Sequence, residues 1–135
     1  MIKTDAQWER TIVQIAGFRA ALKGVDRGSS KRSAAIRKSY AQIIQQLEHE
    51  VREYEPLKSG RVIIPRLDRL DRVASFIAKI RIAKGVSQTE LARRLHVSKQ
   101  VMSRFEESDY QTAGVSTLQR ILDALGMRTA ITLRQ

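Results

Sequence analysis

Hydrogen-bonding side chains are concentrated from the last residue of the sequence LHVS, residues 95–98, onward. A helix that begins after this joint would present them together on its outward face, and they are Ser98, Lys99, Gln100, Ser103, Arg104 and Glu107. A lysine ammonium can donate to O6 and N7 of guanine, and a glutamine amide can bind N6 and N7 of adenine through two hydrogen bonds. Such a helix is chemically suited to reading base edges in the major groove of DNA.

Two residues of the preceding segment, Gln88 and Arg94, have the chemistry to bind the DNA backbone. Ser87 and Glu90 form a capping box, which places Gln88 in the first turn of a predicted helix. There its side chain and a backbone N–H can both reach a phosphate. Arg94 would add positive charge, although an arginine here is equally consistent with an ordinary solvated surface.

Both segments also have an apolar face, which must be packed for the outward face to be presented. The predicted inward positions are Leu91, Leu95, Val97, Met102 and Phe105. Ala92 is small and lets the second helix approach the first closely, and the short joint between them sets a steep angle. The pattern therefore predicts a helix-turn-helix unit.

Two longer amphipathic helices are predicted ahead of this unit. Thr4 and Gln7 form a capping box before the first, whose apolar residues recur at steps of three and four. Its stripe consists of Trp8, Ile12, Ile15, Phe18 and Leu22. A polar loop over residues 24–33 leads to the second helix, whose stripe consists of Ile36, Tyr40, Ile43, Leu47, Val51 and Tyr54. We expect an antiparallel helical hairpin over residues 1–55.

A linker is predicted between the hairpin and the rest of the chain. Pro56 and Pro65 bracket a glycine and a short apolar run, which indicates a boundary over residues 56–66. Residues 67–135 would then form the second domain. Its first helix is expected to run from Leu67 to a glycine stop at Gly85.

The last part of the chain is predicted to hold one more helix and a short strand. Ser116 and Gln119 form a capping box for the helix, and Gly126 ends it. Residues 130–133 are rich in residues that favour strands. Because so short a strand is unstable alone, we expect it to pair with another edge.

The charge balance points to a polyanionic partner. The 135 residues carry a formal net charge of +11 and no cysteine. Such an excess favours binding to nucleic acid, and an acidic protein would fit it equally well. The absence of cysteine excludes disulfides and thiolate zinc sites. With neither a membrane-length apolar run nor a signal peptide in view, we expect a cytoplasmic, nucleoid-associated protein with no membrane partner.

The sequence gives no support for an enzyme. The only histidines, His49 and His96, lie in different predicted modules, and no zincin motif surrounds either. No phosphate loop, nucleophile elbow or dinucleotide fingerprint is present. Glu106 and Glu107 are adjacent on a predicted helix and so point in different directions. We therefore expect no catalytic residues, no cofactor and no metal.

The stretch "GVSQTELARRLHVSKQVMSRFEESDYQTAGVSTLQRILDALGM" resembles the Cro/repressor (XRE-type) helix-turn-helix domain. The resemblance covers about half the chain, from Leu67 onward. It implies a mostly α fold, with the helical hairpin followed by a four- or five-helix DNA-binding domain and a short C-terminal β-strand. It also implies a homodimer that binds a double-stranded DNA operator.

Carried over position by position, the resemblance assigns roles to individual residues. Gln88 would contact phosphate and a flanking base, while the base readers would be Lys99, Gln100 and Ser103. Ser98 and Arg104 would make phosphate or mixed contacts. Arg81 and Glu106 occupy the positions of an ion pair that the family uses structurally. His96 departs from the pattern, which favours glycine at the joint because the backbone there is left-handed.

The ending "STLQRILDALGMRTAITL" is more narrowly similar to HigA-like antitoxins of toxin–antitoxin modules. That likeness implies a repressor of its own operon that also neutralises a toxin, bound through the N-terminal region. Two alternatives stay open. One is a phage or host regulator of the same fold with no toxin partner, and the other is a protein–protein scaffold with no affinity for DNA.

Overall fold

A computed structural model describes residues 1–25 and 30–135 of the chain. Over this part the chain forms six α-helices and one 3-10 helix, with no β-strand. The chain separates into two compact units, Met1–Glu55 and Pro56–Gln135.

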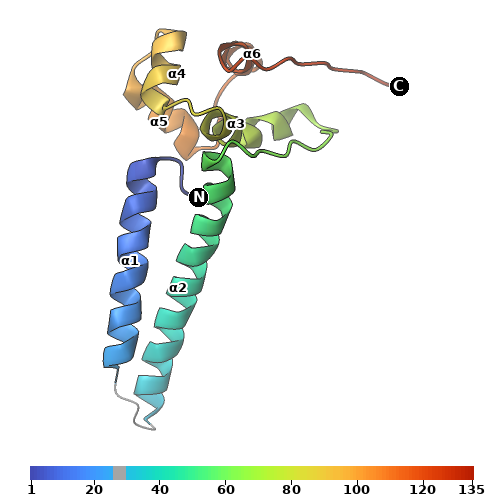
Figure 1. Ribbon diagram of the computed structural model, residues 1–135. Coiled ribbons are helices and arrows are strands. Elements are labelled where there is room, and N and C mark those ends of the chain that lie inside the picture. Colours follow the sequence, from blue (N-terminus) through green and yellow to red (C-terminus); the bar gives the residue numbers. More distant parts are fainter. Residues whose placement is uncertain (26–29) are drawn as a thin grey trace. The chain divides into compact units, whose positions relative to one another are not determined.

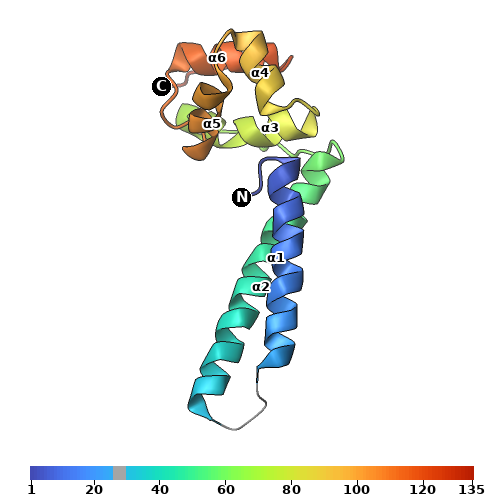
Figure 2. The same cartoon turned by 90° about the vertical axis from the view of Figure 1, so that its left-hand side faces the viewer.

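The first unit is built from α1 (Asp5–Gly24) and the greater part of α2 (Lys31–Lys58), which run antiparallel (Figures 1 and 2). Thr4 caps α1, and its hydroxyl accepts a 3.2 Å hydrogen bond from the Gln7 backbone N–H. The Gln7 side chain in turn accepts from the backbone N–H of Lys3 at 2.8 Å. The predicted start and end of this helix are confirmed.

The second helix begins earlier than the sequence suggested. Residues 24–33 were expected to be a loop, but α2 starts at Lys31. Ser30 supplies the cap, because its hydroxyl accepts from the Ser33 backbone N–H at 3.1 Å and replaces a missing intrahelical partner. The middle of that predicted loop, residues 26–29, lies outside the described residues.

Packing between the two helices is tightest toward the end of the hairpin that carries the N-terminus. Ile2, Ile15 and Tyr54 are buried there, and the Tyr54 hydroxyl donates to Asp5 at 2.7 Å. Nearer the connecting loop, Phe18 and Tyr40 contact each other with ring centroids 5.9 Å apart. The hairpin therefore has a small core concentrated at one end.

One inward position of α1 was predicted wrongly. The structure buries Thr11 and leaves the neighbouring Ile12 40% exposed. The Thr11 hydroxyl donates to the carbonyl of Gln7 at 2.8 Å, so its polar group is satisfied within the helix. A threonine that hydrogen-bonds in this way can occupy an apolar face, which periodicity alone does not reveal.

The boundary region between the units is helical for longer than expected. Pro56 removes one backbone donor from α2, yet the helix continues to Lys58. After Lys58 the chain turns away from the helix at Gly60. The φ of Gly60 is 87°, which allows the Arg61 N–H to reach the carbonyl of Pro56 at 2.9 Å. Residues 61–67 have no regular secondary structure.

The first helical segment of the second unit has two parts. The predicted single helix is a 3-10 helix, η1 (Leu70–Phe76), followed by α3 (Ile77–Ala83). Leu70, Val73 and Phe76 recur at steps of three, which matches the 3-10 period and not the α period. The predicted stop at Gly85 is confirmed, with φ 68° and the Val86 N–H bonded to the carbonyl of Arg81 at 3.1 Å.

The remaining helices are α4 (Gln88–Leu95), α5 (Lys99–Glu107) and α6 (Val115–Ala124). α4 packs against both α5 and α6. Their apolar faces and those of η1 and α3 meet in one core. Its buried residues are Ala74, Ile77, Ala78, Ile80, Val86, Leu91, Ala92, Leu95, Met102, Tyr110, Leu118, Ile121, Leu122 and Leu125.

Two predictions for the end of the chain are wrong. The capping box at Ser116 is not formed, because α6 begins two residues earlier than such a cap would place it, at Val115 with Gly114 as its cap. Residues 130–133 are not a strand. They are exposed and follow the left-handed stop at Gly126, and a strand needs a neighbouring edge to complete its hydrogen bonds.

The joint between α4 and α5 is formed by His96 in the left-handed region, with φ 56° and ψ 39°. Its N–H bonds to the carbonyl of Arg93 at 3.2 Å, and the Val97 N–H bonds to the carbonyl of Ala92 at 3.0 Å. These two bonds close α4 and turn the chain into α5. A non-glycine residue adopts this conformation at a cost.

We expect His96→Gly to stabilise the second unit by roughly 0.5–1 kcal/mol, because glycine enters the left-handed region without steric strain. His96→Val should destabilise it, since a β-branched side chain is disfavoured there. Urea unfolding followed by circular dichroism measures both. Equal midpoints for the glycine and valine variants would contradict the assigned backbone conformation.

Candidate nucleic-acid interface

Helix α5 has two chemically distinct faces. Met102 and Glu106 are buried, while Lys99, Gln100 and Arg104 are exposed. Ser103 is half-buried between the two faces. The structure thus brings the predicted base-reading residues of α5 together on one accessible surface.

Ser98 lies at the start of this surface and acts as the cap of α5. Its hydroxyl accepts from the Val101 N–H at 3.2 Å. The hydroxyl hydrogen is not used in that bond, so Ser98, which is exposed, can still donate to an acceptor such as a phosphate oxygen. One side chain therefore both begins the helix and offers a donor at its exposed end.

The orientation of α5 is fixed by a buried ion pair between Arg81 of α3 and Glu106. The Arg81 Nε contacts Glu106 Oε1, and Nη2 donates to Oε2 at 2.9 Å. Both side chains are at most 4% exposed. Arg81 Nη1 also donates to the carbonyl of Val86 at 2.7 Å. This pairing matches the fork of a guanidinium to both carboxylate oxygens.

Gln88 extends the Arg81–Glu106 ion pair into a larger hydrogen-bond network, which the sequence pattern does not indicate. Its side-chain Nε2 donates to Glu106 Oε2 at 2.6 Å and is partly buried. The side-chain amide nitrogen of Gln88 therefore points toward the buried Glu106 carboxylate. To contact a phosphate as predicted, Gln88 would use its backbone N–H or adopt a different side-chain conformation.

Tyr110 completes the network and was also missed. Its hydroxyl lies 3.1 Å from Glu106 Oε1 and 3.2 Å from Met102 Sδ, and the ring is fully buried. Burial, followed by the nearby Glu106 carboxylate, raises the pKa of Tyr110 well above its usual value. Tyr110 and Asp109 both have positive φ, a conformation that no turn signal in the sequence indicated.

Arg94 is engaged within the domain and not free on its surface. Its Nε donates to Glu90 at 3.0 Å, and its Nη1 donates to the carbonyl of Ala124 at the end of α6 at 2.9 Å. In the opposite direction, Arg120 of α6 donates to the carbonyl of Leu95 at the end of α4, at 3.2 Å. Each helix thus satisfies a terminal carbonyl of the other.

Glu90 connects two of the exposed arginines of α4. Hydrogen bonds from Arg93 and then from Arg94 lower the pKa of Glu90 to about 2. The carboxylate therefore stays ionised throughout the neutral range and offsets part of the positive charge of α4. Within residues 1–25 and 30–135, the exposed cations on α5, Lys99 and Arg104, form no ion pair with a carboxylate.

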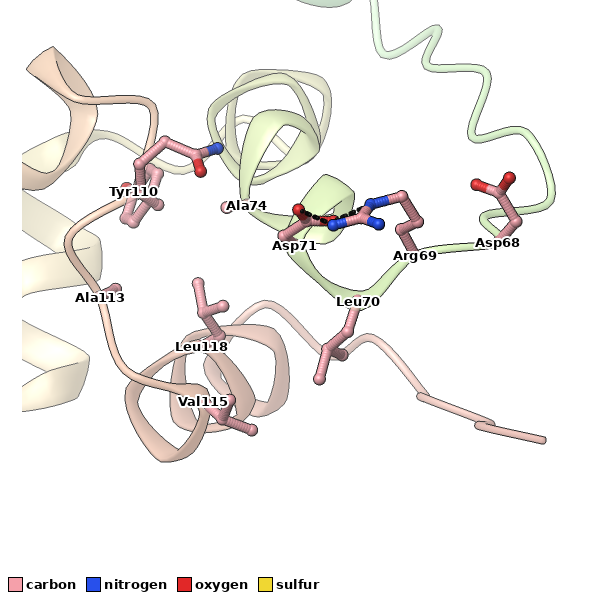
Figure 3. A pocket seen from close by; sticks show the side chains of 10 residues that line it. Asp68, Arg69, Leu70, Asp71, Ala74, Tyr110, Ala113, Val115 and Leu118 are labelled. Atoms are coloured by element: carbon pink, nitrogen blue, oxygen red, sulfur yellow. Dashed lines mark hydrogen bonds and ion pairs between the residues drawn. The ribbon is translucent and has the colours of Figure 1, made fainter. Parts of the chain in front are cut away.

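A pocket of about 570 Å³ opens in the second unit between η1 and the start of α6 (Figure 3). Arg69 and Asp71 lie at its rim and form a hydrogen-bonded ion pair at 2.8 Å. Leu70 and Val115 also line it and are 48% and 63% exposed. The lining of the pocket is therefore mixed, with apolar side chains beside the charged groups of Asp68, Arg69 and Asp71.

No group of three or more acidic or histidine side chains in residues 1–25 and 30–135 is placed to hold a metal ion. Over the same residues, no helix is both long and apolar enough to cross a membrane.

The second unit has the architecture of a helix-turn-helix domain: α4, the His96 joint and α5 form the motif, and η1, α3 and α6 support it. Residues 77–131 match the model of a family described as helix-turn-helix, which identifies this part as similar to DNA-binding transcriptional regulators of the Cro/repressor (XRE) type. No curated protein and no solved structure matches the chain.

We expect Glu106→Gln to destabilise the second unit by about 3–5 kcal/mol, because it leaves the Arg81 guanidinium buried without a counter-charge. Thermal and urea unfolding of the full chain measure the loss. The double variant Arg81→Met with Glu106→Leu removes both charges and should recover part of the lost stability. A single variant as stable as the parent would contradict a structural role for the pair.

Proposed function

We propose that the protein is a DNA-binding transcriptional repressor that reads the major groove with the exposed face of α5. Lys99, Gln100 and Ser103 would contact base edges, and Ser98 and Arg104 would contact phosphates. The observation that supports this most is the arrangement of α5 itself. Its inward side is held by the Arg81–Glu106 pair, so its hydrogen-bonding side chains have one defined direction.

The proposal gives Gln88 and Arg94 supporting roles. Gln88 holds Glu106 from α4, and its own backbone N–H, in the first turn of α4, is available for a phosphate. Arg94 joins α4 to α6, and in this proposal its charge, partly offset by Glu90, would favour nearby phosphates. Removing Arg94 would therefore alter packing as well as charge.

We further propose that the repressor acts as a homodimer. The second unit carries exposed apolar side chains that a single copy leaves uncovered, namely Leu70, Val115, Ile131 and Leu133. The last two lie in the exposed C-terminal segment. Dimers of helix-turn-helix proteins bind two half-sites about one DNA turn apart, near 34–36 Å.

The antitoxin role is the finer proposal and concerns the hairpin. Val13 is 71% exposed, and Ile12, Ile36 and Ile43 are each more than a third exposed. Apolar residues left uncovered on a small hairpin support a protein partner there, which in this proposal is a toxin. A phage or host regulator without a toxin would have a different partner or a second copy at this surface.

The DNA-reading proposal is tested with Gln100→Ala in the full chain. Selection from a pool of randomised duplexes first yields the preferred sequence. Gln100→Ala should then weaken binding to it by roughly 1–3 kcal/mol and relax the preference at one base pair, because a two-bond contact to adenine is lost. Fluorescence anisotropy on selected and randomised duplexes measures both effects.

Gln119→Ala is the matched control, since Gln119 is an exposed glutamine on α6 whose side chain donates to Asp123 within its own helix. It should bind as the parent does. If both glutamine variants bind alike, the assignment of α5 as the reading helix is wrong. The stoichiometry of the same titration tests the dimer, because one chain per duplex would contradict it.

The antitoxin proposal predicts that the product of the neighbouring gene is harmful when expressed alone and harmless with this chain. Val13→Asp should abolish that protection without changing DNA binding, because it places a charge in the exposed apolar surface of the hairpin. Growth and co-purification measure the effect. If the product of the neighbouring gene is harmless alone, or never co-purifies with this chain, the antitoxin proposal is wrong.

A further inference from the structure

Charge is segregated along the N-terminal hairpin. Carboxylates gather toward its first and last residues, where Glu50 lies 3.7 Å from the N-terminal amine and Asp5 accepts from Tyr54. Between Arg10 and Glu48 the sequence holds seven lysines and arginines and a single carboxylate, Asp26. The half of the hairpin near the connecting loop is thus strongly basic.

Four exposed side chains define this surface, which we call the basic tip: Lys23 of α1 and Lys31, Arg32 and Lys38 of α2. The end of α1 lies beside the start of α2 in both views (Figures 1 and 2). Among the described residues, none of these four takes part in an ion pair or a side-chain hydrogen bond. Arg19, one turn further from the loop, is by contrast paired with Glu48.

This arrangement does not stabilise the hairpin. Lys31 and Arg32 occupy the first turn of α2, where the helix dipole disfavours cations, and that turn has no acidic residue. Helices usually relieve such repulsion with carboxylates three or four residues away, and α2 has none there. Lys23, in the last turn of α1, is favourably placed, but folding gains nothing from Lys31 and Arg32. An external polyanion is therefore the better explanation for these cations of α2.

The chemistry of the tip favours the backbone of a duplex over a single strand. Single-stranded nucleic acids are bound through bases that stack on exposed aromatic rings. The nearest rings, those of Phe18 and Tyr40, contact each other inside the hairpin and are at most half-exposed. What remains on the surface is a set of three ammonium groups and one guanidinium, which can bind phosphates without any stacking of bases.

We propose that the basic tip binds the sugar–phosphate backbone of double-stranded DNA without regard to sequence. The inference extends the proposed function, on which it rests: α5 would supply sequence preference, and the hairpin would supply additional affinity that depends on salt. Neutralised phosphates release counterions, so each contact made by the tip adds about 0.9 to the slope of log affinity against log salt.

The test compares two double variants of the full chain on a long duplex of random sequence. Arg32→Gln with Lys38→Gln removes two charges from the tip, and Arg10→Gln with Arg52→Gln removes two from the other half of the hairpin. All four positions are exposed, and glutamine keeps the helix propensity of the residues it replaces. Circular dichroism establishes that each variant is folded.

We expect the tip variant to lower the salt slope by roughly 2 between about 50 and 200 mM salt, and the control variant to lower it much less. Because both variants change the net charge equally, the difference reports the location of the contact. Equal slopes for the two variants would overturn the proposal.

Two further measurements separate the remaining outcomes. Binding to phosphatidylserine vesicles that depends on the tip, with unchanged DNA binding, would overturn the proposal in favour of a membrane surface. Loss of co-purification with an acidic protein, again with unchanged DNA binding, would overturn it in favour of that partner. Gln100→Ala on the selected duplex tests α5 independently, so the tip can fail while the reading helix stands.

Discussion

The buried pairing of Arg81 with Glu106 is the constraint on which the second unit depends. Removing two charges from water is costly, and their mutual attraction offsets that cost only if every remaining polar atom is also bonded. Here Arg81 also donates to the Val86 carbonyl, and Glu106 also accepts from Gln88 and Tyr110. The network therefore joins α3, the start of α4, α5 and the turn after it at one point.

This network determines which way α5 faces. A purely apolar interface would permit small rotations of the helix, because dispersion contacts have little directionality. A carboxylate held by a guanidinium fork, an amide and a phenol allows one arrangement only. The exposed residues Lys99, Gln100 and Arg104 then point in a fixed direction, as a helix that recognises another surface requires.

Much of this architecture was predictable from the sequence because it is set by local rules. The caps at Thr4, Ser87 and Ser98 and the stop at Gly85 depend on neighbouring residues, and each is formed. What was missed depends on distant ones. The burial of Thr11 in place of Ile12 and the sharing of Glu106 by Gln88 and Tyr110 follow from three-dimensional packing. The missing strand at residues 130–133 likewise depends on an edge that the single chain does not provide.

The buried side of α5 is constrained by the folding of the domain, whereas its exposed side is not. Substitutions at positions 99, 100 and 104 leave the buried network untouched, because those side chains make none of its bonds. New outward residues can therefore be introduced at little cost to folding. The domain is a scaffold in which recognition can be reprogrammed, by selection or by design, while Arg81, Glu106 and Tyr110 stay the same.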